Sequence, residues 1–379
     1  IERRLTEDPA SRTVRVQLTL TAGPKVRVGR VRIYGNRFTR DNVIRRAFPE
    51  GARPGDYLDI QSLQAAQTRL QVLRFFNYVR LGNGQDWGLR KDPTAEEPDV
   101  YDIELEVEEG ETRSFNIGAG ISTDGGAFAT LSVTWRNFDI KRPPGRVWDL
   151  FDEDVFRGAG QSFTIAASPG TVFSTYELSF FDPALNDGRW SFGTGLSRRL
   201  ATYDEYTQIT DQVYARIARF LDVRRIWSVQ LEWDLRQVAI EDPDPDAPVN
   251  ALDVQGRSVV HGLAVRFRRS RRNEADAFLN GHVSSLEGSV AGGVLGGDVD
   301  IMKLELEHRS GWRFLQQRSG GWHRIQVTLN GCFAKEFVVT VDVPIFERYF
   351  LGGRSLRGFS FRGVGPRSNG SPLGGVLAM

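Results

Sequence analysis

The chain after Glu111 alternates between apolar and polar residues in one segment after another. In 226–237 every second residue is large and apolar, and the same period of two returns in 258–268, 301–309 and 323–333. A period of two indicates β-strands with one apolar and one polar face. The apolar face of the first segment carries Trp227, Val229, Leu231, Trp233 and Leu235, and its polar face carries Gln230, Glu232, Asp234 and Arg236.

Similar segments bring the number of expected strands to about eleven. They lie near 115–122, 127–137, 161–168, 172–181, 189–200 and 208–220. Such strands form either a soluble sandwich, whose apolar faces meet, or a membrane barrel, whose apolar face meets lipid. Strand lengths of about nine residues or more, charges on the polar face and aromatic residues near strand ends favour the barrel. These aromatic residues are Trp135, Phe180, Phe181, Trp190, Trp227 and Trp312.

Residues 24–110 mix helical and strand periods. Their order predicts a small α+β module of strand, helix, helix, strand and strand. Thr39 is the expected N-cap of the first helix, and the second helix has an apolar face made of Leu63, Ala66, Leu70 and Leu73. Upstream, 12–20 alternates as a strand with no partner of its own before it. We interpret it as the last strand of an earlier module.

Composition and short motifs argue against several classes of function. Lysine plus arginine number 49 against 48 aspartate plus glutamate, so the basic excess typical of nucleic-acid binding is missing. The one cysteine, Cys332, allows no internal disulfide. No apolar stretch approaches the roughly 18 residues of a transmembrane helix. Residue 1 is isoleucine and no leader sequence is visible, so a mature chain or an excised piece is expected.

No constellation for enzymatic or cofactor chemistry is recognisable. The four histidines have no metal-ligand spacing, and neither a P-loop lysine nor a complete dinucleotide loop is present. Asp242, Asp244 and Asp246 occupy the first, third and fifth positions of a calcium loop. However, Ala247 stands where that loop requires glycine, and Asp253 stands where glutamate is usual. We therefore expect a solvated acidic loop, no metal, no cofactor and no enzymatic activity.

Residues 349–370 do not fit either a linker or a core strand. They contain six glycines and four arginines but no carboxylate, together with several large apolar side chains. The stretch resembles the signature loop of the BamA-type outer-membrane protein assembly factor family. The residues that carry the resemblance are Glu347, Arg348, Phe350, Gly352, Gly353, Arg357, Gly358, Phe359, Gly365 and Pro366. Residues 24–110 resemble a POTRA domain of the same family, and "SFFDPAL" resembles its turn after the fourth barrel strand.

The resemblance implies an α+β POTRA module followed by an antiparallel transmembrane β-barrel. Residues 1–22 would end a preceding POTRA domain, 23–111 would form the last one, and 112–379 would form part of the barrel. The signature loop, 334–375, would fold into the lumen, with Arg357 meeting the inner wall. The family barrel has about sixteen strands. Since an open edge is not tolerated in lipid, this sequence of about 11–12 strands is expected not to close by itself.

The resemblance also implies a function, namely assembly and insertion of β-barrel proteins into the bacterial outer membrane. Clients would pair at a weak lateral seam without nucleotide hydrolysis. The seam strand would consist of Phe115, Asn116, Ile117, Gly118, Ala119, Gly120, Ile121 and Ser122. Its two glycines weaken a strand, although they could serve curvature alone. Expected partners are unfolded outer-membrane β-barrel proteins, accessory periplasmic lipoproteins and outer-membrane lipid, but no nucleic acid.

Two other functions stay open at this point. A transport pore of the two-partner-secretion type would share the domains and the loop, and a soluble β-rich binding protein or enzyme would share only the strand pattern. The expected turn at 139–158 is long for the POTRA side of a barrel. It is either a contact for an accessory partner or an insertion without a role.

Overall fold

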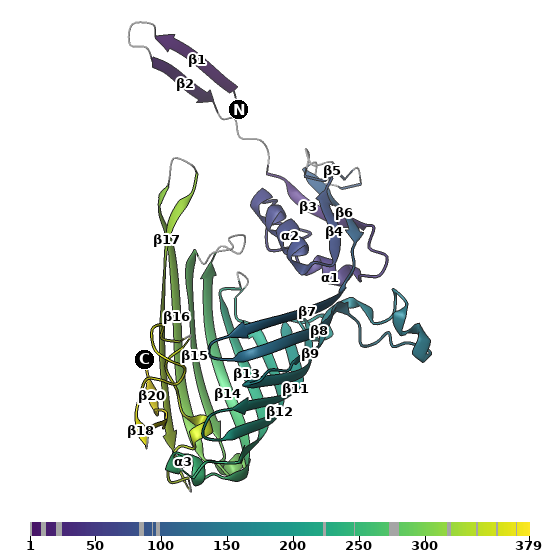
Figure 1. Cartoon of the computed structure of the whole chain (residues 1–379). Helices are drawn as coiled ribbons and strands as arrows, with labels where there is room; N and C mark the ends of the chain where they lie inside the picture. Colours follow the sequence, from purple (N-terminus) through teal and green to yellow (C-terminus); the bar gives the residue numbers. More distant parts are fainter. Residues whose placement is uncertain are drawn as a thin grey trace.

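The structure is a computed structural model. It describes residues 2–8, 13–19, 25–82, 87–92, 94–95, 99–222, 225–245, 247–272, 280–316, 320–338, 340–353, 355–368 and 370–379. Along the chain, a two-stranded hairpin is followed by a small α+β domain and then by a large curved sheet (Figure 1). Within the described residues, every helix is too short or too polar to cross a membrane.

The N-terminal hairpin corrects one expectation from the sequence. Strand β2 (Thr13–Thr19) pairs antiparallel with β1 (Glu2–Asp8), so it does have a partner upstream. The sequence of β1, ERRLTED, has Leu5 as its one apolar residue and so shows no apolar period. The pairing depends on backbone hydrogen bonds, which the side-chain pattern does not report.

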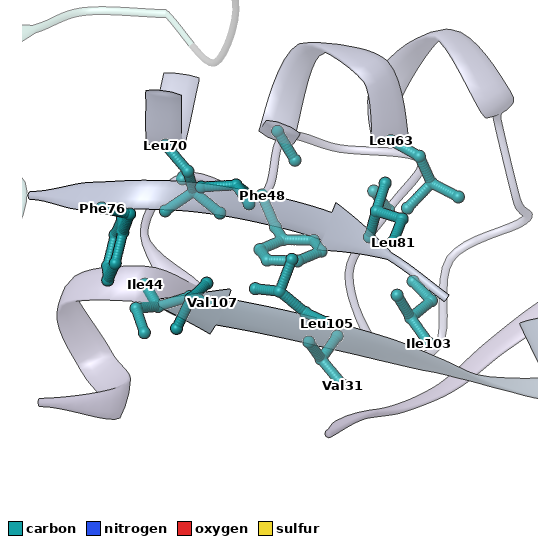
Figure 2. Packing of buried hydrophobic residues seen from close by; sticks show 14 of the residues in the cluster. Val31, Ile44, Phe48, Leu63, Leu70, Phe76, Leu81, Ile103, Leu105 and Val107 are labelled. Carbon is teal, nitrogen blue, oxygen red and sulfur yellow. The ribbon is translucent and has the colours of Figure 1, made fainter. Parts of the chain in front are cut away.

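The α+β domain packs two helices against one mixed sheet. The sheet order is β3-β6-β4, with β5 added on β6, and β3 runs parallel to β6. In Figure 2, side chains from the helices and from the strands interlock in one apolar core. This confirms the predicted element order, to which β5 is an addition. The elements are β3 (Arg27–Tyr34), α1 (Asp41–Arg45), α2 (Ile60–Leu73), β4 (Phe76–Leu81), β5 (Leu89–Lys91) and β6 (Val100–Glu109).

The start of α1 differs from the prediction. Its N-cap is Arg40, which makes no side-chain capping bond. Thr39 is instead buried, and its Oγ1 accepts a hydrogen bond of 2.8 Å from Nδ2 of Asn137, which is in β8 (Gly126–Phe138). The hydroxyl group is thus used between the two domains rather than within the helix.

This contact belongs to a joint that fixes the α+β domain to β8 and β9 (Arg157–Ser168). The backbone N–H of Arg40 donates to the carbonyl of Gly158 at 3.0 Å, and the Arg40 guanidinium forms an ion pair with the fully buried Asp139. From the sheet side, Arg157 donates to the carbonyl of Gly110 at 2.7 Å. These bonds hold the domain at one defined end of the sheet.

The large sheet contains the expected eleven long strands, joined antiparallel in sequence order from β7 to β17, and a short twelfth strand, β20 (Leu377–Ala378). Beyond β8 and β9 they are β7 (Arg113–Ser122), β10 (Phe173–Asp182), β11 (Trp190–Thr202), β12 (Thr207–Phe220), β13 (Trp227–Glu241), β14 (Gly256–Arg272), β15 (Gly281–Ala291), β16 (Ile301–Gln316) and β17 (Trp322–Glu336).

Short elements occupy the connections. The end of the sheet near α3 lies opposite the α+β domain, and the segment between β8 and β9 projects sideways from the domain end (Figure 1). Of the acidic loop, Asp246 lies outside the described residues, and no cluster of metal-binding side chains occurs among those that are described. The short elements are η1 (Val147–Phe151), η2 (Leu185–Asp187), α3 (Val249–Leu252), η3 (Gly293–Leu295), η4 (Ile345–Glu347), β18 (Arg367–Ser368) and β19 (Ser371–Pro372).

The two faces of the sheet differ as the alternation predicts. On β13, Leu231 is 39% exposed on the outer face, whereas Glu232 and Asp234 line a cavity of about 550 Å³ on the inner face. Phe180 lies in an aromatic cluster with Phe138. Phe181 differs from the expected outer position, because it alternates with Phe180 and so lies on the face of the cavity, like Thr175 and Glu177.

The outer face is expected to meet lipid, which gives a direct test on β13. We expect Leu231→Arg to lower the free energy of unfolding by about 2–4 kcal/mol in a bilayer, because a lipid-facing arginine near mid-membrane is costly. Gln230→Arg is the matched control, since Gln230 lies on the inner face and donates to Glu232 at 3.0 Å. Urea unfolding in vesicles measures both, and equal losses would show that the faces are misassigned.

Candidate functional site

After β17 the chain folds back over the inner face of the sheet. We call residues 337–376 the plug segment. Val343 and Ile345 are fully buried there, the first in a cluster with Val260 of β14 and Ile301 of β16, and the second in a cluster with Ile240 of β13. These apolar contacts attach the plug segment to the inner wall at the end of the sheet away from the α+β domain.

Glu347 is the electrostatic centre of the plug segment. It is 2% exposed, and its two carboxylate oxygens have different cationic partners. Nη1 of Arg236 lies 2.7 Å from Oε1, and Nζ of Lys303 lies 2.5 Å from Oε2. Arg236 also pairs with Asp234 at 2.6 Å. A buried carboxylate is tolerated only when it is paired in this way, so Glu347 ties the plug segment to β13 and β16.

The two residues after Glu347 extend this attachment. Arg348 donates from Nε to the carbonyl of Val343 at 2.7 Å and forms an ion pair with Asp342. The hydroxyl of Tyr349 donates to Oε1 of Glu305 on β16 at 3.0 Å. In the Glu-Arg part of the signature, Glu347 therefore contacts the inner wall, and Arg348 stabilises the turn before it.

The glycine pair of the signature allows a close backbone crossing. Gly352 has φ +120°, and a Cβ there would lie 2.1 Å from the carbonyl oxygen of Ser360. Gly353 has φ +57°, and a Cβ there would lie 2.5 Å from Oδ2 of Asp124, in the turn between β7 and β8. Both positions exclude side chains. The glycine pair of the plug segment thus lies against the turn of the first hairpin of the sheet.

A second arginine, Arg362, sits in an aromatic cage. It is 6% exposed, and its guanidinium lies 3.5 Å from the ring centroid of Phe350 and 4.2 Å from that of Tyr203. Its Nη2 donates to the hydroxyl of Tyr206 at 2.9 Å. Burial raises the pKa of Tyr206, in the turn between β11 and β12, to about 12, so this acceptor is neutral. Cation–π contacts are strongest when they are desolvated in this way.

Arg357, the predicted tip residue, is exposed, unlike the buried Arg362. Arg357, Gly358 and Phe359 are exposed, as are Gly365 and Pro366. The resemblance places the acidic partner of Arg357 on a strand outside this sequence, so its contact with the inner wall stays a prediction. Arg362 could not be singled out from the sequence, since nothing in the local pattern separates it from the other arginines of the loop. Arg236 and Lys303 were also missed, although both lay at charged positions of the predicted inner faces.

The expected seam strand coincides with β7, which forms one edge of the twelve-stranded sheet. Its outward residues are very exposed, with Phe115 at 63%, Ile117 at 75% and Ile121 at 89%. Leu231 in the middle of the sheet is only 39% exposed. The difference arises because, among the described strands, β7 has a neighbour on one side only, namely β8.

The two glycines of β7 also have a packing role. A Cβ at Gly118 would lie 2.8 Å from Oγ1 of Thr130, and one at Gly120 would lie 2.8 Å from the ring of Phe128. Both neighbours are on β8, so the glycines let side chains of β8 lie over β7. They serve local packing as well as weakening the strand.

The Glu347 ion pairs give a stability test. We expect Glu347→Gln to lower the free energy of unfolding by about 3 kcal/mol, because removing one partner leaves buried charge uncompensated. Asp342→Asn is the control within the same segment. It removes an ion pair whose carboxylate is 62% exposed, and such a pair contributes about 1 kcal/mol or less. Urea unfolding that shows equal effects would contradict the central role of Glu347.

Comparisons with known proteins agree with this geometry. The Omp85 superfamily domain matches residues 156–379, and the POTRA model, described as a surface antigen variable number repeat, matches residues 26–110. The chain is 26% identical over 383 residues to the outer membrane protein assembly factor BamA of Nitratidesulfovibrio vulgaris, covering 99% of this chain and 43% of that protein. It thus spans less than half the length of this relative.

A eukaryotic relative and two solved structures are also similar to the chain. The human sorting and assembly machinery component 50 homolog is 26% identical over 227 residues, covering 58% of this chain and 45% of that protein. The structure of BamA from Haemophilus ducreyi lacking POTRA domains 1–3 matches with a TM-score of 0.64 at 18% identity, covering 99% of this chain and 70% of that one. CdiB from Escherichia coli matches with a TM-score of 0.51 at 11% identity, covering 94% and 62%. The chain belongs to the Omp85 superfamily, as a POTRA domain followed by an incomplete β-barrel.

Proposed function

We propose that the protein assembles and inserts β-barrel proteins into the bacterial outer membrane, with its POTRA domain in the periplasm. The observation that carries the proposal is the order of the chain, a POTRA domain followed by an antiparallel sheet whose first strand is β7. As the first strand of a barrel, β7 can pair along its outer edge only with the last strand or with a client that adds a strand of its own. Similarity to BamA over 99% of the chain supports the same role.

Strand exchange at this edge requires no nucleotide. Each unpaired backbone group in lipid costs several kcal/mol. When one strand replaces another at the edge, about the same number of hydrogen bonds is made as is lost. The two paired states are therefore close in free energy, and a client can move from the edge into its own barrel without ATP.

The structure holds the first hairpin at both ends. At the domain end, Nδ2 of Asn137 on β8 donates to Oγ1 of Thr39 in the α+β domain at 2.8 Å. At the other end, Gly353 of the plug segment lies against Asp124 of the hairpin turn. Phe361 supports the neighbouring turn, with its ring centroid 5.7 Å from that of Phe173 on β10. We infer that these contacts keep β7 in place while its outer edge exchanges partners.

The proposed partners are unfolded outer-membrane β-barrel proteins, accessory periplasmic lipoproteins and membrane lipid. The segment 139–158 is the candidate contact for an accessory protein. It projects from the sheet beside the POTRA domain (Figure 1), and it carries Val147 at 72% exposure and Trp148 at 81%. Exposed apolar residues on a projecting segment are typical of a binding surface.

The transport pore remains the alternative function. Similarity to CdiB from Escherichia coli, at 11% identity, is a similarity of fold alone and does not favour transport. The number of clients separates the two functions. Depletion of an assembly factor lowers the level of many outer-membrane barrel proteins, whereas loss of a dedicated pore affects one exported protein.

The seam proposal predicts where clients crosslink. In a Cys332→Ala background, Ala119→Cys and Ile121→Cys are expected to form disulfides with cysteines in the C-terminal strand of a stalled client. Gly120 should stay unchanged, since its position is filled by the ring of Phe128. The measurement is the fraction of client that migrates as a crosslinked product on a non-reducing gel.

The control places cysteines at Ala264 and Val265 of β14, which has neighbours on both sides. These positions are expected to give few products, because no backbone edge is free there. Equal yields from β7 and β14 would contradict client pairing at the seam.

The two arginines of the plug segment should separate stability from assembly. Arg362→Ala is expected to lower the free energy of unfolding by about 2 kcal/mol, since it removes a desolvated cation from an aromatic cage. Arg357→Ala should change stability by no more than about 0.5 kcal/mol, as exposed substitutions do. It is nevertheless expected to reduce the assembly of client barrels, because Arg357 belongs to the family signature. Normal client levels with Arg357→Ala as the sole copy would rule out a role for this residue.

A further inference from the structure

The outer wall of β13–β16 changes from apolar to polar between two adjacent rows of residues. Cross-strand partners in one row are apolar throughout: Val229, Phe267, Leu286 and Leu306. Two residues closer to the POTRA end, the next row consists of Trp227, Arg269, Ser284 and His308. The row after that continues the change with Arg271, His282 and Ser310.

Alternation places all three rows on the outer face. In the middle of these strands, the residues that line the inner cavity include Ala264 on β14, Glu287 and Ser289 on β15, and Lys303 and Glu305 on β16. The positions of the three rows alternate with these along each strand, so their side chains point away from the lumen. The polar rows are therefore a patch on the surface that faces the membrane.

Hydrogen bonds organise the centre of this patch. Nδ1 of His308 lies 2.8 Å from Oγ of Ser284, and its Nε2 lies 2.7 Å from Oγ of Ser310. Nδ1 of His282 lies 2.8 Å from the same Ser310 oxygen. The two imidazole rings stack with centroids 6.2 Å apart. The bond to Ser310 uses Nδ1 of His282, and Nε2 of the same ring has no hydrogen-bond partner among the described residues.

The arginines of the patch differ from those on the inner face. On the inner face, Arg266 pairs with Glu287 and Arg309 pairs with Glu307. Arg269 and Arg271 have no acidic residue in their rows and form no ion pair with another described residue. Arg269 instead lies over the ring of Trp227, 5.5 Å from its centroid. Charged groups at the border of an apolar wall are stable only with a counter-charge or water.

We propose that Arg269, Arg271 and His282 bind the phosphate of a phospholipid in the periplasmic leaflet of the outer membrane. Guanidinium groups match phosphate oxygens in a two-bond geometry, and aromatic residues such as Trp227 lie at the level of headgroups. The apolar row of Phe267, Leu286 and Leu306 begins directly beside the arginines, where the acyl chains of the same lipid would lie. A surface with both parts fits an amphiphile better than a free anion.

The site requires the barrel to lie in a membrane, but it does not depend on the proposed assembly role. It would attach the β13–β16 wall to the leaflet through specific lipid contacts. In this it differs from the edge at β7, which is proposed to exchange protein strands.

The test measures binding of phosphatidylglycerol to the delipidated full-length protein in detergent by native mass spectrometry. Arg269→Gln with Arg271→Gln is expected to weaken binding by about tenfold or more, since charge-assisted hydrogen bonds are lost. Arg269→Lys with Arg271→Lys keeps both charges and is expected to recover most of the binding, which separates the effect from misfolding. The control is Arg219→Gln, which removes another arginine stacked over a tryptophan, Trp190 at 5.4 Å, without the histidine and serine rows.

Several results would overturn the proposal. One is equal binding by the glutamine variant and the parent, and another is an equal loss in the Arg219→Gln control. Displacement of the lipid by millimolar inorganic phosphate would assign the site to a soluble anion. A photo-crosslinking amino acid in place of Val327, opposite Ser310 on β17, is expected to capture lipid in cells. Capture of protein alone would assign the patch to a protein partner.

Discussion

A strand in a bilayer must pair its backbone N–H and C=O groups within the protein, because lipid offers no hydrogen-bond partner. The eleven strands from β7 to β17 meet this requirement with one continuous antiparallel ladder. Other features of the fold depend on that ladder. It makes the residues of each strand alternate between the outer and the inner face. It also leaves unpaired backbone N–H and C=O groups only at the edge strands. The edge at β7 is where the proposed function resides.

The alternation creates an inner face that carries full charges, and the plug segment makes use of them. Arg236 and Lys303 sit on different strands, and Glu347 joins both with a single buried carboxylate. The glycine pair then lets the chain cross itself and approach the turn of the first hairpin. The segment thereby links β13 and β16 to the hairpin that contains β7. The aromatic cage around Arg362 stabilises this path from the turn between β11 and β12.

At the other end of the barrel the POTRA domain is attached to the same region of the sheet. Thr39 and Asn137 form a buried hydrogen bond, and Asp139 pairs with Arg40. The first two strands are thus supported from both ends, while the wall from β13 to β16 lies farther along the sheet. On that wall the border between apolar and polar rows is sharp. The proposed lipid site and the proposed seam are consequently on different parts of the barrel.

The sequence by itself determined the two-domain order, the number of long strands and the faces of β13, because each depends on the local period of apolar residues. It also indicated the family through the signature loop, in which Gly352 and Gly353 have positive φ and no room for a side chain. The pairing of β1 with β2 could not be predicted from the sequence, since β1 has no apolar period. The tertiary structure alone decided which arginine is caged, which cations meet Glu347 and what Thr39 contacts. Each of these depends on residues far apart in the chain, with Arg236 and Glu347 separated by 111 positions, and no local pattern encodes which distant partner will be adjacent after folding.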